Sequence, residues 1–150
     1  MHKYDLDIHE SALKAMADDA VEAYNDECCG FFYGSEEQGK RIIKQAIPVT
    51  NSKEGDKRRR FEISPLDYMK AEQFAIEHNT TLLGVYHSHP DHPAKPSEHD
   101  LKQAVPFFSY IIISVMKGNI ADTSSWQLNE QGQFEQEMIL NKDILSTNYS

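Results

Sequence analysis

The stretch GVYHSHPDHPAKPSEHD, residues 84–100, places two histidines two positions apart at the end of an apolar run. An apolar run of this length predicts a buried central strand. Because alternate residues of a strand share one face, His87 and His89 are expected to point in the same direction, with Leu83 and Val85 on that face further back. Two imidazoles on one face at the end of a strand form half of a zinc site.

The residues after the second histidine form a proline-rich loop that leads to a short helix. Pro93 and Pro96 stiffen this loop, because each proline ring restricts its own backbone. Ser97 begins the helix and Asp100 falls in its first turn, so the loop can bring this carboxylate back over the two histidines. Two histidines and one aspartate leave a fourth tetrahedral position for water, which is the arrangement of a catalytic rather than a structural zinc site.

Each part of this pattern also has a plainer interpretation. Ser97 and Asp100 fit an ordinary capping arrangement, in which an acidic residue lies three positions after the helix cap. The chain contains seven histidines, so one H-x-H pair can arise by chance, and we expect His92 and His99 to face solvent. The combination is more specific than its parts, because an apolar strand, H-x-H-P and a seven-residue spacer before S-x-x-D occur together.

Composition and charge describe a globular, acidic protein. The chain has 150 residues, which corresponds to a single domain over 1–150. A domain of this size can bury a hydrophobic core without disulfide bonds or structural metal ions. Its hydrophobic fraction of 39% and charged fraction of 26% exclude a disordered chain. The formal net charge of -9 argues against a nucleic-acid partner, because binding nucleic acid requires cations that neutralise phosphates.

Cysteine usage and hydropathy predict a cytoplasmic, reducing location and no membrane. Cys28 and Cys29 are adjacent, so they cannot readily bridge to each other, and we expect both to pack in the core. The first residues, MHKYDLDIHESAL, lack the apolar centre of a signal peptide. The longest apolar run, YIIISVM, is far shorter than the roughly 20 residues that span a bilayer.

The order of predicted elements indicates an α+β sandwich, a mixed sheet with helices packed on it. Apolar residues at three- and four-residue spacing predict a helix over 9–24, and Ser64 followed by Pro65 marks the start of a second helix over 64–79. Gly34 is expected to end the first strand. The other predicted elements are a helix over 97–105 and strands over 29–34, 41–51, 58–64, 81–89, 107–116, 124–128 and 134–140.

The stretch HSHPDHPAKPSEHD resembles the JAMM signature of the MPN+ zinc metalloproteases, H-x-H-x(7)-S-x-x-D, without a departure. It is most similar to the prokaryotic branch, which acts with ubiquitin-like sulfur-carrier proteins. Upstream, ECCGFFYG resembles the family's glutamate-x-x-glycine strand start, and FEISPLDYMKAE resembles its strand-to-helix step. The resemblance covers about residues 9–118. It implies a single MPN/JAMM domain, a mixed β-sheet flanked by helices with a cytidine-deaminase-like architecture.

The resemblance also implies a catalytic site with one Zn²⁺ per chain. The family's zinc ligands fall on His87, His89 and Asp100, its catalytic glutamate on Glu27, and its serine near the metal on Ser97. The implied chemistry is amide hydrolysis in which the glutamate takes a proton from water, without a covalent intermediate. The serine can cap the helix and also stabilise an oxyanion, because a hydroxyl can accept one hydrogen bond and donate another.

The family's substrate is an extended C-terminal tail, often ending in Gly-Gly, that lies beside a sheet strand. The resemblance therefore implies a ubiquitin-like sulfur-carrier protein as partner and cleavage after its diglycine. The loops lack the long insertions of polyubiquitin-specific relatives, which favours a small carrier. The basic cluster KRRR, residues 57–60, fits either acidic residues on a carrier or a solvated strand edge. The sequence leaves a homodimer open.

Alternatives from other functional classes are weaker. A non-catalytic MPN scaffold organises a larger complex, but such scaffolds lack part of the ligand set that is intact here. A DNA-repair-associated JAMM-like protein carries a similar H-x-H-P motif, but the acidic net charge and the sequence DHPAKPS fit that branch less well. The deaminase motifs H-x-E and P-C-x-x-C are absent, and HESAL lacks the second histidine of H-E-x-x-H.

Overall fold

The computed structural model describes residues 4–58 and 60–141. Within these residues the chain forms one mixed sheet of seven strands together with three helices, which confirms the predicted α+β class. In chain order the elements are β1 (Asp5–Ile8), α1 (Glu10–Ala23), β2 (Cys29–Glu37), β3 (Lys40–Val49), α2 (Pro65–Glu77), β4 (Thr81–Pro90), α3 (Glu98–Gln103), β5 (Ser109–Met116), β6 (Asn119–Leu128) and β7 (Phe134–Glu137).

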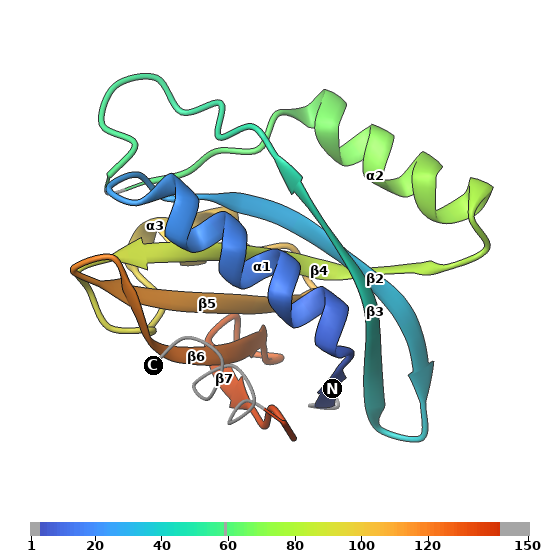
Figure 1. Cartoon of the computed structure of the whole chain (residues 1–150). Helices are drawn as coiled ribbons and strands as arrows, with labels where there is room; N and C mark the ends of the chain where they lie inside the picture. The colour runs from blue at the N-terminus through green and yellow to red at the C-terminus, as the bar shows by residue number, and fades with distance from the viewer. Residues whose placement is uncertain (1–3, 59, 142–150) are drawn as a thin grey trace.

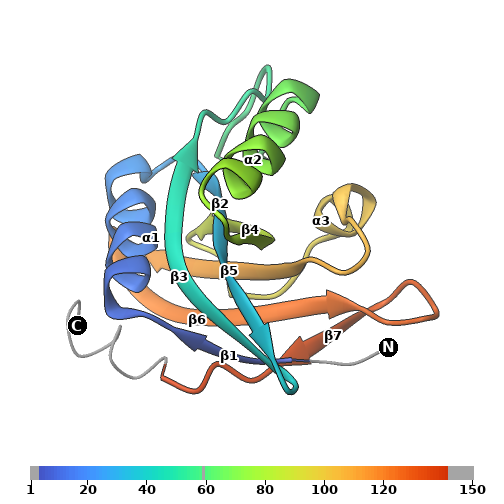
Figure 2. The ribbon, with the colours of Figure 1, turned by 90° about the vertical axis from the view of Figure 1, so that its right-hand side faces the viewer.

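The strand order is β1-β3-β2-β4-β5-β6-β7, so β4 lies at the centre of the sheet. The pairs β1–β3 and β4–β5 are parallel, and the other neighbours are antiparallel. β1 also meets the chain after β7, because the Leu6 N–H donates to Met138 O at 2.8 Å and the Leu140 N–H donates to Leu6 O at 2.9 Å. The two ends of the sheet therefore come together (Figure 2), which covers backbone groups that an open edge would leave unpaired.

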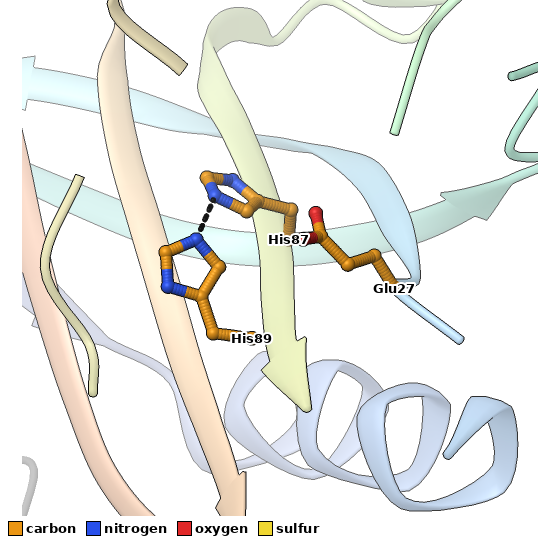
Figure 3. A group of neighbouring side chains, drawn as sticks. All are labelled: Glu27, His87 and His89. Carbon is orange, nitrogen blue, oxygen red and sulfur yellow. Dashed lines mark hydrogen bonds between the residues drawn. The ribbon is translucent and has the colours of Figure 1, made fainter. Parts of the chain in front are cut away.

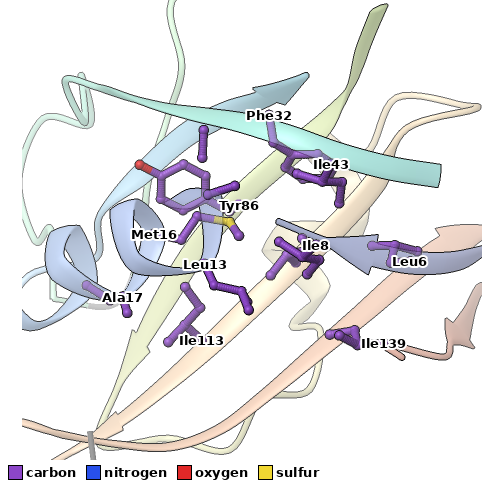
Figure 4. Packing of buried hydrophobic residues seen from close by; sticks show 14 of the residues in the cluster. Leu6, Ile8, Leu13, Met16, Ala17, Phe32, Ile43, Tyr86, Ile113 and Ile139 are labelled. Atoms are coloured by element: carbon purple, nitrogen blue, oxygen red, sulfur yellow. The ribbon is translucent and has the colours of Figure 1, made fainter. Parts of the chain in front are cut away.

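Helices lie on both faces of the sheet (Figures 1 and 2). α1 covers one face, where Leu13 and Met16 pack in a cluster with Tyr86 of β4 and Ile113 of β5 (Figure 4). α2 lies on the other face, where Ala71 joins a second buried cluster. Because side chains pack against β4 on both faces, the end of this strand is a rigid support for functional groups.

β4 departs from simple alternation at one residue. The neighbours Phe32 and Tyr33 of β2 pair across a step of two residues in β4, which leaves Leu83 as an extra, bulged residue. The expectation that Leu83 and Val85 share the histidine face is therefore wrong for Leu83. Leu83 packs in the cluster under α1, whereas Val85 packs in the cluster under α2. Alternation holds only beyond the bulge.

The predicted strand over 58–64 is wrong. Residues 60–64 have no ladder partner, and residue 59 lies outside the described residues. Side-chain and loop contacts satisfy this segment instead. The Glu62 N–H donates to Asn51 Oδ1 at 3.1 Å, and Glu62 O accepts from the Ser52 N–H at 2.9 Å. Local hydrogen bonds of this kind compete with ladder pairing and are not visible in a hydrophobic pattern.

The other differences concern strand ends. β2 does not stop at Gly34, because a register shift lets the strand continue to Glu37. The sequence pattern did not predict β1, which is only four residues long, and the predicted last strand extends beyond the end of β7 at Glu137.

Cys28 and Cys29 are buried and free, as expected. Among the helices in the described residues, none combines the length and apolar character that a membrane span needs.

Candidate metal centre

β4 delivers His87 and His89 to one side of the sheet near its carboxyl end. Both side chains are buried, with 1% and 7% of their surface exposed. Their Nε2 atoms lie 3.2 Å apart (Figure 3), so the two imidazoles share a face as the alternation predicts. The Phe61 ring stacks on the His87 ring with 4.5 Å between centroids, which fixes the orientation of this imidazole.

α3 brings Asp100 to the two imidazoles. Its Oδ2 atom lies 3.1 Å from His89 Nε2 and 3.3 Å from His87 Nε2. The same oxygen accepts a hydrogen bond from the Ser97 N–H at 2.9 Å, and the Asp100 N–H donates to Ser97 Oγ at 3.1 Å. The capping box is therefore present, and the carboxylate that closes it is also the one that meets the histidines.

The three atoms His87 Nε2, His89 Nε2 and Asp100 Oδ2 have the spacing of zinc ligands. Tetrahedral bonds of about 2.0–2.1 Å place neighbouring ligand atoms about 3.3 Å apart. The observed separations are 3.1, 3.2 and 3.3 Å. One divalent cation bound among these atoms can accept a lone pair from each, so the residues present fit a metal ion.

The environment of two of these groups favours the forms that bind metal. Burial lowers the pKa of His87, which favours the neutral imidazole. Burial opposes ionisation of Asp100, but the two histidines and the Ser97 N–H hold its pKa well below its usual range. A neutral imidazole and an ionised carboxylate are the forms in which these side chains ligate zinc.

His89 is oriented by the loop that follows it. Its Nδ1 lies 2.9 Å from Pro93 O, which can only accept, so Nδ1 carries a proton and a neutral His89 presents a bare Nε2. Burial lowers the pKa of His89, but hydrogen bonds to Asp100 and Pro93 outweigh burial and raise it. Protons therefore compete with a cation at this nitrogen, and metal binding at this centre depends on pH.

Glu27 approaches the centre from the residues just before β2, where Cys29 pairs with His87. One of its oxygens lies within 4.8 Å of a ring nitrogen of both histidines (Figure 3). The side chain is 5% exposed, and among the described residues its Oε1 has no hydrogen-bond partner. Burial raises the pKa of Glu27 to about 8. A buried carboxyl group that titrates near neutral pH beside a metal site suits proton transfer.

The two carboxyl groups are placed differently. Asp100 lies at ligand distance from both imidazoles, at 3.1 and 3.3 Å, and is tied down by the capping box. Glu27 is only within 4.8 Å of them and keeps a buried oxygen without a partner in the part of the chain that is described. By distance, Asp100 fits the third ligand, and Glu27 fits a neighbour of the water position.

A cavity of about 460 Å³ opens beside the centre, within the ~300–1,000 Å³ range of ligand sites. Exposed His92 lines it, whereas His99 is half-buried with Nε2 3.2 Å from Phe61 O, so the expectation of a solvent-facing His99 is wrong. The cavity is lined by Glu27, His89, His92, Pro93, Lys95 and Ser97. The structure thus brings together all five site residues that the sequence indicates: Glu27, His87, His89, Ser97 and Asp100.

Asn51 supports the backbone beside Glu27, and no sequence pattern indicates this role. Its Nδ2 donates to Glu27 O and to Arg60 O, both at 3.1 Å. Its Oδ1 accepts from the N–H groups of Lys53 at 3.0 Å and Glu62 at 3.1 Å. The Asn51 side chain therefore makes all four of its possible hydrogen bonds and ties the loop over residues 53–62 to the backbone of Glu27. Asparagine after a strand is an ordinary turn residue, so only the fold reveals this role.

The chain matches one known protein family. Residues 9–129 match the family described as prokaryotic homologs of the JAB domain. The chain belongs to this family. Its membership confirms the resemblance to JAMM and MPN+ proteins, and the matched region contains the whole candidate centre. The JAB-domain match begins one residue before α1 and ends just after β6.

Curated relatives align over different shares of their own lengths. A probable TtuB-protein conjugate cleaving protease of Thermus thermophilus is 34% identical over 74 residues, 49% of this chain and 49% of that protein. Tail tip assembly protein K of Escherichia phage N15 is 27% identical over 114 residues, 75% of this chain and 42% of that protein. Desampylase of Pyrococcus furiosus is 28% identical over 120 residues, 80% of this chain and 79% of that protein. The chain thus matches about half or less of the first two relatives.

Solved structures share the fold. A Desulfitobacterium hafniense protein superposes with a TM-score of 0.78 at 26% identity, over 90% of this chain and 91% of that chain. A JAB1/MPN domain protein from Archaeoglobus fulgidus gives 0.54 at 19% identity, over 91% and 99% of the two chains. A JAMM protein with a metalloprotease-like zinc site gives 0.52 at 17%, over 93% and 99%. The last two identities show the fold alone, which confirms the MPN/JAMM architecture.

Proposed function

We propose that the chain is a zinc-dependent peptidase that hydrolyses the amide bond after the C-terminal Gly-Gly of a ubiquitin-like or sulfur-carrier protein. The observation that carries this proposal is the convergence of His87, His89 and Asp100 at ligand spacing, with buried Glu27 and a cavity beside them. Family membership supports it, because two matched relatives are named as a conjugate cleaving protease and a desampylase.

The donor set fits Zn²⁺. Two imidazole nitrogens and one carboxylate oxygen suit zinc, whereas calcium and magnesium sites are built from oxygen ligands. When bound, zinc supplies a Lewis acid that polarises a carbonyl and lowers the pKa of water to about 7. Asp100 would hold the ion rigidly, because the Ser97 N–H fixes the same Oδ2 atom. His87 would also hold the ion rigidly, because the Phe61 ring stacks on its imidazole.

Glu27 is proposed as the group that moves the proton. It accepts a proton from the attacking water as the new C–O bond forms at the scissile carbonyl. It then gives that proton to the leaving nitrogen as the C–N bond breaks, so the products are a carboxylic acid and an amine. Burial raises the pKa of Glu27 to about 8, and a neighbouring cation favours its carboxylate form. Glu27 can therefore take up and release a proton near neutral pH.

Ser97 is proposed to bind the substrate carbonyl oxygen. Its Oγ accepts a hydrogen bond from the Asp100 N–H at 3.1 Å, so the hydroxyl proton remains for another acceptor. Ser97 also lines the cavity. A donor held in advance at the reacting carbonyl stabilises the negative charge that develops on its oxygen.

A diglycine tail suits the approach to this centre. His87, His89 and Glu27 are all buried, so the scissile carbonyl must reach them from the adjoining cavity. Glycine has no side chain to obstruct such an approach. Exposed Lys57 and Arg60 form a basic surface that suits acidic residues on a carrier protein. The names of the Thermus and Pyrococcus relatives support a ubiquitin-like partner.

Metal content and cleavage, measured on one preparation, test the proposal. The full chain is purified without chelator, its zinc is quantified, and a sulfur-carrier protein extended past its Gly-Gly is supplied as substrate. We expect about one zinc per chain and release of the extension. Glu27→Gln should keep zinc and lose about 10²–10⁴-fold in kcat. His89→Ala should lose both zinc and cleavage.

His78→Ala provides the matched control, because His78 is exposed at the end of α2, away from the centre. It should keep zinc and cleavage. Zinc binding without cleavage of any extended carrier would overturn the peptidase assignment in favour of a non-catalytic scaffold. Absence of zinc after reconstitution would overturn the metal assignment itself.

A further inference from the structure

The cavity beside the metal centre has a basic wall. Of its lining residues, Lys95 and His92 can offer positive charge or N–H donors, and Glu27 is acidic. Lys95 is exposed and has no salt-bridge partner among the residues that the structure describes. The whole chain carries a formal net charge of -9, so a lysine at the reaction cavity is not part of a general basic surface. This wall indicates an anionic group in the ligand.

The loop that carries these two side chains is fixed at three successive carbonyl oxygens, each of which accepts a hydrogen bond from a different strand. The donors and acceptors are Ser114 Oγ to His92 O, His89 Nδ1 to Pro93 O, and Ser124 Oγ to Ala94 O. Strands β5, β4 and β6 thus hold the backbone immediately before Lys95. A side chain that projects from a fixed backbone loses less freedom on binding, which favours a defined subsite over a mobile surface charge.

The chemistry of the substrate limits where an anion can come from. A Gly-Gly tail carries no charged side chain, and its scissile carbonyl is part of a neutral amide. The charge must therefore belong to the leaving group. An α-amino acid in amide linkage has its free carboxylate two bonds from the leaving nitrogen, whereas a lysine side chain of a conjugated protein has no carboxylate there.

A carboxylate at this place also needs compensation. Glu27 is acidic and lines the same cavity, so its carboxylate form repels a second anion brought beside the scissile bond. A cation among the residues that line the cavity offsets that repulsion. Lys95 is the lysine among the residues that line this cavity.

We propose that Lys95, assisted by His92, forms a carboxylate-binding subsite that makes the chain prefer carriers extended by one α-amino acid with a free carboxylate over lysine-linked conjugates. This inference rests on the proposed peptidase function and specifies the leaving group of the same site. It makes Lys95 a specificity-determining residue with no part in the bond-breaking step.

Matched substrates test the subsite. A ubiquitin-like sulfur-carrier protein is prepared with three endings: Gly-Gly-Ala with a free carboxylate, Gly-Gly-Ala amide, and Gly-Gly-Asp amide. The third ending separates a main-chain carboxylate from a side-chain one. We expect kcat/KM for the free carboxylate to exceed that for the alanine amide about tenfold, which corresponds to one hydrogen bond to a charged group. Lys95→Met should reduce this ratio to near one, mainly through KM, and Lys95→Arg should restore part of it.

Lys70→Met, an exposed lysine of α2, is the control and should leave the ratio unchanged. Equal losses on all three substrates in Lys95→Met would overturn the subsite, because they would indicate contact with the carrier body. Preference for the aspartyl amide would overturn the main-chain assignment.

A binding measurement keeps the two proposals separate. Zinc-treated Glu27→Gln protein is titrated with N-acetyl-Gly-Gly-Ala and with its amide, and NMR shifts are followed. We expect tighter binding of the free acid, lost when Lys95→Met is added. Equal binding of both peptides overturns the subsite whether or not the wild-type chain cleaves carriers. Selective binding without any cleavage keeps the subsite and overturns the peptidase function.

Discussion

Two clusters of buried charge lie near opposite ends of β4, and they differ in how their polar atoms are satisfied. At one end, Arg41 is 3% exposed, and its guanidinium donates to four oxygens while its Cζ lies 4.2 Å from the centre of the Tyr4 ring. The oxygens are Glu36 Oε1, Leu83 O, Ser109 Oγ and Phe107 O. At the other end, Glu27 Oε1 and His87 Nδ1 are buried without hydrogen-bond partners in the described part of the chain.

The contrast separates a structural cluster from a functional one. Protein oxygens accept the hydrogen bonds that the buried Arg41 guanidinium would otherwise donate to water. A ligand would therefore gain little by binding to this cluster. In the metal centre, three lone-pair donors crowd within 3.3 Å and a carboxyl oxygen stays unsatisfied. Binding of a cation or a substrate would therefore stabilise this arrangement. Four predictions test this difference, from the largest expected effect to the smallest.

Removing Arg41 should cost the most stability. Arg41→Met leaves Leu83 O, Ser109 Oγ and Phe107 O without their donor, so we expect a loss of about 3–5 kcal/mol in the free energy of unfolding. Urea denaturation measures it, and zinc content per folded chain should not change, because the cluster lies away from the metal centre. Arg58→Met, at a side chain that is 69% exposed, should stay within about 0.5 kcal/mol. Equal effects of the two variants would contradict a structural role for Arg41.

The stability of chelator-treated protein should fall as pH rises through the Glu27 transition. Burial raises the pKa of Glu27 from 4.5 to about 8, so the folded state holds this proton more tightly than the unfolded state. The stabilisation is complete below about pH 4.5 and is lost by about pH 8, up to about 4 kcal/mol. Denaturation at several pH values, compared with Glu27→Gln, isolates this contribution. Parallel pH profiles for the two proteins would show that the buried oxygen is not destabilising.

Zinc should stabilise the chain through the metal centre alone. At a free concentration of 100 times Kd, binding to the folded state adds about 2.7 kcal/mol. Thermal unfolding with and without zinc measures the gain, which we expect in wild type and equally in Arg41→Met. His89→Ala should show no gain. A gain that is lost in Arg41→Met would mean that the two clusters are coupled.

Loosening the loop above Glu27 should have the smallest effect. Asn51→Ala removes four hydrogen bonds at a partly solvated site, so we expect a loss of about 1–2 kcal/mol in stability. Because Asn51 positions Glu27 without touching substrate, kcat should fall more than KM changes. Asn51→Asp keeps the acceptor for Lys53 and Glu62 but loses the donor to Glu27 O, so it should reproduce the kcat defect with a smaller stability loss. An unchanged kcat in both variants would remove Asn51 from the site.

Several parts of the site could be predicted because they depend on local geometry. The two-residue period of a strand puts His87 and His89 on one face, and the three-residue spacing from Ser97 to Asp100 sets up a capping box. The two interpretations of Asp100, helix cap or metal ligand, concern one carboxylate, which closes the capping box and also lies at ligand distance from His89. Local periodicity and local hydrogen bonds need no knowledge of distant segments.

Other parts could not be predicted, because a distant segment overrides the local pattern. Leu83 would lie on the histidine face if β4 were regular, but pairing with β2 forces a bulge that turns it to the α1 side. Residues 60–64 have the apolar alternation of a strand, yet their backbone bonds to Asn51 and Ser52 instead of a ladder. The hydrophobic pattern contains no information about either partner.

The amino-acid sequence by itself determined the α+β class, the direction of the two histidines and the start of α3, since each follows from strand or helix periodicity and short-range capping. The family resemblance indicates Glu27 as a site residue, but only the tertiary structure shows how Glu27 reaches this centre. The Cys28 N–H, one residue after Glu27, donates to Ser88 Oγ of β4 across a separation of 60 residues. Beside this contact Glu27 is buried, and its Oε1 has no hydrogen-bond partner among the residues that the structure describes. Contacts of that range are set by how the strands pack, and no local pattern specifies them.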